Sequence, residues 1–377
     1  MAEATRIEPF EAIARRWLDA IAEQTGPLSF FDAHTHIGRN DPDGFVQEPA
    51  ELLATIERAG ARAVCFPMHE LDGYATANDE AIATAAASAG RLVAFCRVNP
   101  HDDALAEARR CLDAGARGIK LHPRAEDFAM HHPVVEQLVA LADERRVPIL
   151  IHAGRGIPAL GRDTLDLATR HPQTHLILAH CAVSDLAWLW HLMPAHPNLL
   201  IDTSWWNPAD LIALFSLVPP AQIVWASDSP YGHPIGSAAL HMRYALTAGL
   251  GREAIASIAG GRLERLLAGE PAREVGPPPG PATLPLDPSM ERVVSHLLVA
   301  IGFARAGGNP GEQLALARLA CDVDGPHATV AAELVNLLDL AERHQGPPPP
   351  GRRFPPSMQF VMAALCLAST PDVPLPD

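Results

Sequence analysis

The chain has little lysine and a shortage of positive charge. Its 377 residues contain 29 lysines and arginines against 44 aspartates and glutamates, so the formal net charge is −15 with histidines neutral. Lys120 is the only lysine in the sequence. An excess of negative charge opposes binding to phosphate backbones and to anionic lipid surfaces. We therefore expect a small-molecule substrate and no nucleic-acid or membrane partner.

Long apolar runs and paired cysteines are also missing. The longest apolar runs, 211–218 and 360–368, fall far short of the ~18 residues that a membrane-spanning helix needs. The N-terminal segment carries acids where a signal peptide would have its apolar stretch. The six cysteines include no CxxC pair, which indicates buried free thiols in a reducing compartment. A cytoplasmic location is expected.

Short apolar runs alternate with helical patterns along the first two thirds of the chain. Residues 103–115 and 133–145 have helical spacing, and a glycine ends the first of these segments. Buried parallel strands read as continuous apolar runs, so eight strand–helix units predict an α/β fold, a closed (β/α)8 barrel of the TIM type. The absence of a glycine-rich phosphate loop after the first run argues against a dinucleotide-binding sheet. The eight runs lie at 28–36, 61–68, 91–100, 116–123, 147–154, 174–182, 198–204 and 222–230.

Extra segments are expected at both ends of the barrel, which we assign to 28–270. An N-terminal helix over 8–23, within segment 1–27, is expected to lie across the N-terminal mouth of the barrel. Seven prolines in 271–288 predict an extended connector at 271–289. The remainder, 290–377, is predicted to be a helical extension. Its last helix is apolar on all sides, which favours a packed subdomain or a homo-oligomer interface. The predicted helices of the extension are 290–304, 312–321, 328–343 and 357–368.

Histidines and one aspartate stand at the ends of several predicted strands. His34 and His36 form an HxH pair, and this spacing puts both imidazoles on one face of a strand. They lie at the C-terminal end of the predicted barrel, where TIM-barrel enzymes have their catalytic residues. A lone buried histidine is usually a hydrogen-bonded core residue, but burying several with a carboxylate is costly unless a metal pairs with them. The other members are His122, His152, His180 and Asp228.

Five short motifs that contain these residues suggest a family. FDAHTHIG, GIKLHP, LIHAG, LAHCA and ASDSP occur in this order over residues 28–267, and with them the chain resembles the amidohydrolase superfamily, specifically its amidohydrolase-2 branch of metal-dependent hydrolases and decarboxylases. The resemblance implies a TIM-type barrel in which four residues bind a divalent metal, usually zinc, while His180 contacts the reacting group or a bound water. The sequence departs from the family in its two terminal segments and in Gly-Gly-Arg at 260–262. The implied metal ligands are His34, His36, His152 and Asp228.

Three imidazoles and a carboxylate suit one zinc ion, and manganese or iron would suit the same set. Such a metal lowers the pKa of bound water toward ~7 and so supplies hydroxide at neutral pH. We expect a metal-dependent hydrolase that acts on an amide, lactone or related bond of a small organic acid. Asp228 is the candidate general base and acid, and His180 would polarise the carbonyl. Two alternatives stay open: a non-oxidative decarboxylase of the same family, and a non-catalytic, metal-stabilised scaffold.

Lys120 is a further catalytic candidate. Of the 29 lysine and arginine positions, all except this one are arginines, so a single lysine suggests a position where a guanidinium would not serve. In GIKLHP its side chain shares a strand face with Gly118 and His122, and a buried ammonium needs a partner. It is expected either to hydrogen-bond the substrate or, as a carboxylated lysine, to bridge a second metal. A structural ion pair is the alternative.

Arginines and tryptophans near the strand ends are candidates for substrate binding. A guanidinium fork suits a carboxylate, and a pair of indoles offers a flat apolar wall. Surface solvation and loop packing are the alternatives, and any one arginine is more often structural. The candidates are Arg97, Arg124 and Arg155, with Trp205 and Trp206 in the loop after the seventh run.

Overall fold

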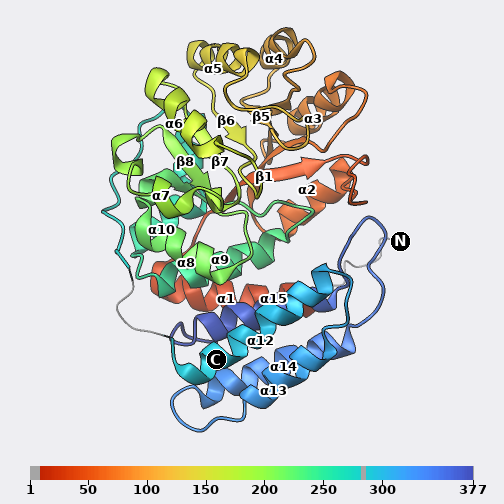
Figure 1. Cartoon of the computed structure of the whole chain (residues 1–377), viewed down its shortest axis with the longest axis vertical. Helices are drawn as coiled ribbons and strands as arrows, with labels where there is room; N and C mark the ends of the chain where they lie inside the picture. Colours follow the sequence, from red (N-terminus) through yellow and green to blue (C-terminus); the bar gives the residue numbers. More distant parts are fainter. Residues whose placement is uncertain (1–8, 282–285, 377) are drawn as a thin grey trace.

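A computed structural model of the chain describes residues 9–281 and 286–376. The barrel forms the upper part of the molecule and a group of helices forms the lower part (Figure 1). Each of the eight predicted runs forms a strand, which confirms the α/β barrel, and the third run is divided between β3 and β4. The strands are β1 (Phe31–Ile37), β2 (Arg62–Pro67), β3 (Leu92–Ala94), β4 (Cys96–Arg97), β5 (Ile119–Leu121), β6 (Ile149–Ile151), β7 (Leu176–Leu178), β8 (Leu199–Asp202) and β9 (Ile223–Val224).

The strands are parallel and pair in chain order, β1 to β3 and β4 to β9. Backbone hydrogen bonds between the ends of the series close the barrel: Ala33 N donates to Trp225 O at 3.0 Å, and His36 N donates to Ser229 O at 2.8 Å. Phe95 separates β3 from β4 because the chain moves there from pairing with β2 to pairing with β5. These pairings bring the C-terminal ends of all the strands to one mouth.

Large apolar side chains fill the inside of the barrel. Phe66, Phe95 and Leu150 are examples, and Leu263 and Leu266 of α11 pack against the same cluster. The outer faces of the strands pack against the surrounding helices. These helices are α2 (Pro49–Arg58), α3 (Ala75–Ala87), α4 (Ala104–Asp113), α5 (Pro133–Arg145), α6 (Leu160–Arg170), α7 (Leu186–Leu189), α8 (Pro208–Leu217), α9 (Pro234–Thr247), α10 (Arg252–Ala256) and α11 (Arg262–Leu267).

The N-terminal helix α1 (Pro9–Thr25) lies between the barrel and the helical extension, packed along α9 (Figure 1). Phe10 meets Phe360 of the extension edge to face, with 6.0 Å between ring centroids. Trp17 is buried beneath the guanidinium of Arg243, 4.9 Å from its ring centroid. The expectation that this helix lies across the barrel mouth is therefore wrong. Its apolar stripe is buried against helices instead.

The helical extension is docked firmly on the barrel. Arg243 of α9 is fully buried, and it donates to the hydroxyl and carbonyl of Thr370 and to the carbonyls of Val373 and Pro374, at 2.9 to 3.0 Å. A buried guanidinium is costly unless its N–H groups are satisfied, so these bonds fix the end of the chain to α9. The extension contains α12 (Pro288–Arg305), α13 (Gly311–Ala320), α14 (Ala328–Arg343) and α15 (Ser357–Ser369).

Three smaller expectations can be compared with the structure. All six cysteines are buried free thiols, as predicted. Residues 271–280 of the connector have no regular secondary structure, while 282–285 lie outside the described residues. Of the described helices, none has the length and apolar character to cross a membrane.

Candidate metal centre

His34, His36 and Asp228 form a compact cluster at the C-terminal mouth of the barrel. Both histidines lie on β1, and Asp228 follows β9, the strand beside it. One carboxylate oxygen of Asp228 lies 3.2 Å from His34 Nε2 and 3.1 Å from His36 Nε2. Each of the three side chains offers a ligand atom within 4.8 Å of the other two. Two imidazoles and a carboxylate in this arrangement are typical of a divalent metal site.

Asp202 fixes the orientation of His34. It ends β8 and is fully buried, and its Oδ2 lies 2.8 Å from His34 Nδ1. Its Oδ1 accepts hydrogen bonds from the backbone N–H groups of His180 and Ser204, both at 2.9 Å. A carboxylate only accepts, so His34 Nδ1 carries the proton and Nε2 keeps its lone pair. Asp202 is not among the predicted site residues, although an acid that ends an apolar run is a visible signal.

His152 is held by His180. The carbonyl of Ser204 lies 2.8 Å from His180 Nδ1 and can only accept, so His180 Nε2 accepts in turn from His152 Nδ1 at 2.9 Å. The lone pair of His152 then resides on Nε2, which is buried and has no hydrogen-bond partner among the described residues. Gly154 leaves space beside this atom, since a Cβ there would come within 2.6 Å of it. An unpaired lone pair in a buried site is costly unless a ligand takes it.

Burial determines the charges of the cluster. It lowers the pKa values of His34, His36 and His152 well below 6.5 and raises the pKa of Asp228 well above 3.8. The neutral His34 Nε2 therefore faces a carboxyl oxygen 3.2 Å away. Two acceptors at that distance need a proton or a cation between them. The residues present thus fit a divalent metal, with His34, His36 and Asp228 as the closest set and His152 as the fourth predicted ligand.

The backbone at the ends of β7 and β9 is strained. His180, Cys181 and Ala182 have φ values of 57°, 58° and 47°, and Asp228 has a φ of 60°. Residues other than glycine rarely adopt this left-handed conformation, which costs about 1–3 kcal/mol at each position where it persists. The hydrogen bonds of His180 to Asp202 and of the Asp228 N–H to His34 O, both 2.9 Å, hold it in place. Strain of this kind clusters at functional sites.

Asp32, two residues before His34, is a second buried acid that the sequence reasoning does not include. Its Oδ1 accepts from His34 N at 3.0 Å and from Ser227 N at 2.9 Å, which ties β1 to the end of β9. Burial raises its pKa to about 7. Asp32 therefore supports the backbone of the cluster and does not belong to the ligand set.

Lys120 is fully buried and faces the cluster. Its Nζ lies 3.3 Å from His34 Nε2 and 4.8 Å from the centroid of the Phe66 ring. Burial, followed by the charge of Arg97, lowers its pKa to about 7. Among the described residues it has no carboxylate within 4 Å, so the ion-pair alternative has no support here. Its role in the reaction stays a prediction.

Two of the predicted roles do not fit the side-chain contacts. Both ring nitrogens of His180 are hydrogen-bonded within the protein, so neither is free to polarise a substrate carbonyl. Arg97 is buried, and its guanidinium is paired with Glu126, with Nε 3.1 Å from Oε1. Glu126 also accepts from the hydroxyl of Tyr74 at 2.6 Å. Arg97 therefore serves an internal ion pair and is not available to a substrate.

The other predicted substrate-binding residues lie toward the surface. Arg124 and Arg155 are exposed. The guanidinium carbon of Arg155 lies 5.6 Å from the ring centroid of Trp205, and the ring of Trp205 lies 6.3 Å from that of His180. Trp205 is partly buried, and its Nε1 donates to Asp210 at 2.6 Å. The structure therefore brings Trp205 beside His180, and Arg155 beside Trp205. His122 also belongs to this group, stacked on His152 at 3.8 Å between ring centroids.

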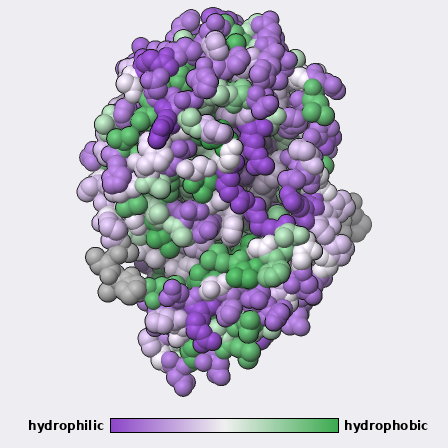
Figure 2. Space-filling model, viewed as in Figure 1, coloured by the Kyte–Doolittle hydropathy of each residue, from purple (hydrophilic) through white to green (hydrophobic). Residues whose placement is uncertain are grey.

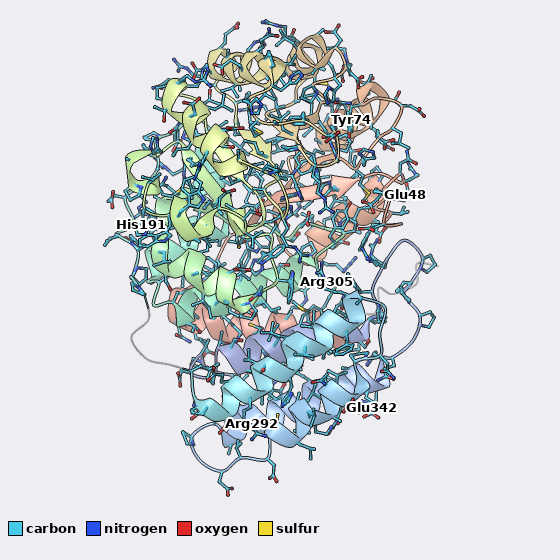
Figure 3. The ribbon with its side chains drawn as sticks, viewed as in Figure 1. Glu48, Tyr74, His191, Arg292, Arg305 and Glu342 are labelled. Carbon is cyan, nitrogen blue, oxygen red and sulfur yellow. The ribbon has the colours of Figure 1, made fainter. Side chains whose placement is uncertain are left out.

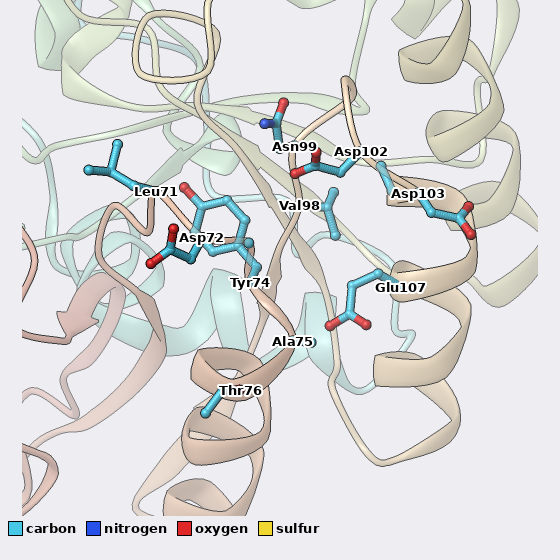
Figure 4. Close-up of a pocket in the computed structure, with 12 residues that line it drawn as sticks. Leu71, Asp72, Tyr74, Ala75, Thr76, Val98, Asn99, Asp102, Asp103 and Glu107 are labelled. Atoms are coloured by element: carbon cyan, nitrogen blue, oxygen red, sulfur yellow. The ribbon is translucent and has the colours of Figure 1, made fainter.

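A pocket of about 330 Å³ lies beside the loops that follow β2 and β4 (Figure 4). Its lining includes four acids: Asp72, Asp102, Asp103 and Glu107. Tyr74, whose hydroxyl donates to Glu126, forms part of the wall of this pocket. Acidic walls disfavour an anionic ligand, so this pocket does not suit the organic acid expected at the metal cluster.

Comparison with known proteins places these residues in context. A family model described as Amidohydrolase matches residues 31–261, which run from β1 to the turn before α11. The match therefore includes His34, His36, His152 and Asp228 and stops before the helical extension. The search of curated proteins gave no match.

Solved structures of similar fold have low sequence identity to the chain. An uncharacterised TIM-barrel protein from Bordetella bronchiseptica is 16% identical with a TM-score of 0.52, and an amidohydrolase II is 18% identical with a TM-score of 0.51. A 2,6-dihydroxybenzoate decarboxylase in complex with 2,6-dihydroxybenzoate is 15% identical with a TM-score of 0.50. Each alignment covers 64% of this chain and 99%, 100% and 100% of the other chain, respectively. At these identities the similarity shows the TIM-barrel fold alone.

Proposed function

The chain belongs to the amidohydrolase family, and from this premise we propose that it is a metal-dependent hydrolase of a small organic acid, acting on an amide, lactone or related bond. The observation that carries the proposal is the convergence of donor groups at one barrel mouth. His34 and His152 each keep an Nε2 lone pair because Asp202 and His180 fix their tautomers, and the carboxylate of Asp228 lies 3.2 Å from His34 Nε2.

The chain's own residues have distinct tasks in this proposal. His34, His36, His152 and Asp228 would hold the metal, for which we propose zinc; when bound, it supplies an activated water and polarises a carbonyl. Asp228, whose carboxylate lies within 3.2 Å of His34 Nε2 and His36 Nε2, is suited by its position to accept a proton from the attacking water and to return it to the leaving group. Lys120 places its amine nitrogen 3.3 Å from His34 Nε2, and its protonated form favours an anionic substrate.

Lys120 also favours a second candidate reaction, non-oxidative decarboxylation. A buried ammonium beside the cluster suits a substrate whose carboxylate lies at the reacting position. In that reaction the bond from carbon to the carboxyl group breaks, its electron pair stays on carbon, and CO₂ leaves. A proton held by Asp228 would then be transferred to that carbon. The family includes both reaction types, so turnover has to separate them.

The test is turnover of matched substrates by the full chain of known metal content. The panel contains lactones, amides and aromatic acids, each assayed before chelation, after chelation and after return of zinc or manganese. Hydrolysis that follows the metal content supports the first candidate, and release of CO₂ supports the second. Full activity in a metal-free preparation refutes both, and bound metal without turnover would favour the scaffold alternative. Asp228→Asn is expected to lower kcat by about 100-fold or more.

We also propose that the chain forms a homo-oligomer through the extension. Hydrophobic residues gather over its helices on the face in Figure 2. Exposed apolar side chains include Val299 and Phe303 of α12 and Leu319 of α13, the last 69% exposed. Light scattering of the wild type and of Phe303→Glu with Leu319→Glu tests this, since the double variant is expected to be a smaller species. An unchanged mass would refute the proposal.

A further inference from the structure

The helical extension reaches the mouth of the barrel at two points. Arg305, the last residue of α12, places its guanidinium carbon 5.4 Å from the ring centroid of Trp206, in the loop after β8 (Figure 3). The segment before α15 binds the loop after β1, where Gly351 O accepts from Val46 N at 3.1 Å. A part of the chain outside the family match therefore contributes a side chain to the surroundings of the site.

Arg155 and Arg305 lie on adjoining indoles. Arg155 contacts Trp205 at 5.6 Å, Arg305 contacts Trp206 at 5.4 Å, and the two indole centroids are 6.2 Å apart. Trp205 in turn lies 6.3 Å from the ring of His180. A guanidinium on an aromatic face keeps the N–H groups along its edge available for a carboxylate.

The two guanidinium groups have no acidic partner in the described part of the chain. Within residues 9–281 and 286–376, neither Arg155 nor Arg305 has a carboxylate oxygen within 4.0 Å, although acids outnumber bases by 44 to 29 in the sequence. Their neighbour Arg353 is paired with Asp43 at 2.9 Å. Arg305 is exposed. Partial desolvation of its guanidinium, then the charges of Arg155 and Arg353, lowers the pKa of Arg305, and the charge of Asp43 opposes this. Because Asp43 is paired with Arg353, neither Arg155 nor Arg305 has an ion-pair partner of its own among the described residues.

We propose that Arg155 and Arg305, supported by Trp205 and Trp206, form a subsite for a second carboxylate of the substrate. The substrate class is then an elongated, flat organic diacid, with one end at the metal cluster and the other at the end of α12. This inference rests on the proposed function for the position of the reacting end. It assigns the helical extension a part in substrate recognition.

The competing explanation is that Arg305 on Trp206 only joins the extension to the barrel. The two explanations differ in what Arg305→Met does. Loss of a packing contact lowers stability and affects all ligands alike. Loss of a subsite removes the preference for a diacid over the monoacid of the same shape.

The experiment is calorimetric titration of the full chain, metal-loaded and metal-free, with rigid acid pairs. The pairs are terephthalate and benzoate, naphthalene-2,6-dicarboxylate and 2-naphthoate, and biphenyl-4,4′-dicarboxylate and biphenyl-4-carboxylate. The variants are Arg305→Met, Arg305→Lys and Arg155→Met. Arg292→Met is the matched control, because Arg292 is an exposed arginine of the same helix at the end far from the barrel mouth (Figure 3).

The wild type is expected to bind at least one diacid about tenfold more tightly than its monoacid, because a charge-assisted bidentate pair forms at the subsite. Arg305→Met and Arg155→Met should bring this ratio close to one, Arg305→Lys should keep part of it, and Arg292→Met should leave it unchanged. A wild-type ratio of one at every length, or a ratio that survives Arg305→Met, overturns the inference. The ratio is taken within each variant, so a loss of stability does not imitate the result.

Metal-dependent turnover, measured on the same preparations, tests the proposed function separately. A diacid preference that depends on Arg305 without any turnover keeps the subsite and refutes the hydrolase. Metal-dependent turnover with the same KM in the wild type and in Arg305→Met keeps the hydrolase and refutes the subsite.

Discussion

Replacing Asp202 by asparagine should weaken metal binding at the site without a direct change to any predicted ligand. Asp202 Oδ1 accepts from two backbone N–H groups at 2.9 Å, so the amide oxygen of an asparagine is held there and its NH₂ faces His34 Nδ1. Two donors then face each other across the 2.8 Å now taken by a hydrogen bond. His34 can relieve this by moving its proton to Nε2, which takes the lone pair away from the cluster.

The magnitude follows from the role of such carboxylate–histidine pairs. Loss of a partner behind a metal-bound histidine weakens metal binding by about 10–100-fold, which corresponds to about 1.4–2.7 kcal/mol. If the amide flips instead, two buried N–H groups lose their acceptor, at about 1–3 kcal/mol for each group. The variant should therefore bind zinc more weakly and also unfold more easily when it is metal-free.

The assay is competition for zinc against a chromogenic chelator, with thermal unfolding of the metal-free proteins measured in parallel. Asp210→Asn is the matched control, because its carboxylate accepts from the indole of Trp205 at 2.6 Å and contacts no predicted ligand. We expect wild-type zinc affinity in the control. Zinc affinity within twofold of the wild type in a folded Asp202→Asn protein would show that the tautomer argument is wrong.

Three further changes probe the acid of α1, the loop contact of the extension and the buried lysine. The hydrogen bond from His233 is the main cause that lowers the pKa of buried Glu11 from 4.5 to about 2. The ionised carboxylate of Glu11 therefore stabilises the folded state by about 3 kcal/mol above pH 4.5, and this contribution is lost as the pH falls toward 2. Glu11→Gln should thus be less stable than the wild type at pH 7, with a difference that narrows below pH 4.5 in urea titrations; a constant difference contradicts this. Arg352→Ala removes the bonds of this guanidinium to the Val46 carbonyl and to the Glu51 carboxylate, and a contact of 3.5 Å to Gln47, whose amide donates to Ser229 after β9. We expect kcat to fall several-fold and the free energy of unfolding to fall by about 1–2 kcal/mol; unchanged kcat would refute the coupling. Lys120→Met and Lys120→Arg should each lower kcat by about 100-fold. If the number of bound metal ions also falls from two to one, Lys120 is the carboxylated lysine that bridges two metals. Near wild-type kcat in either variant would show that Lys120 is structural.

The fold was predictable because each buried strand is a continuous apolar run, and buried parallel strands need little more than that signal. Phe95 shows the limit: nothing in the run 91–100 shows that the chain changes pairing partner there. The location of α1 was also beyond sequence reasoning. An apolar stripe indicates that one face of a helix is buried, and it does not indicate whether the barrel or the extension covers that face.

Site prediction was stronger for ligands than for the groups that hold them. His34 and Asp228 were visible because strand ends of a barrel converge and their side chains coordinate metals. Asp202 was overlooked because a single acid after an apolar run has many explanations. Arg97 was misassigned because its partner Glu126 comes from a loop, and spacing along the chain does not reveal ion pairs of that kind. Side-chain partnership, and not residue type, decides which arginine remains free for a substrate.

The packing of the extension bears directly on its proposed role. Buried Arg243 anchors the chain end at Thr370, and Phe10 of α1 packs edge to face on Phe360 of α15. Helix α12 packs against α15, which is fixed to the barrel. The backbone of Arg305, the last residue of α12, is therefore held in a defined position relative to the barrel. Because the backbone that carries Arg305 is ordered during folding, binding of a carboxylate by its side chain loses less conformational freedom than it would on a loose tail. The rigidity of the extension therefore supports the subsite. If the same arginine were on a mobile tail, it would give little preference for a diacid of one particular length.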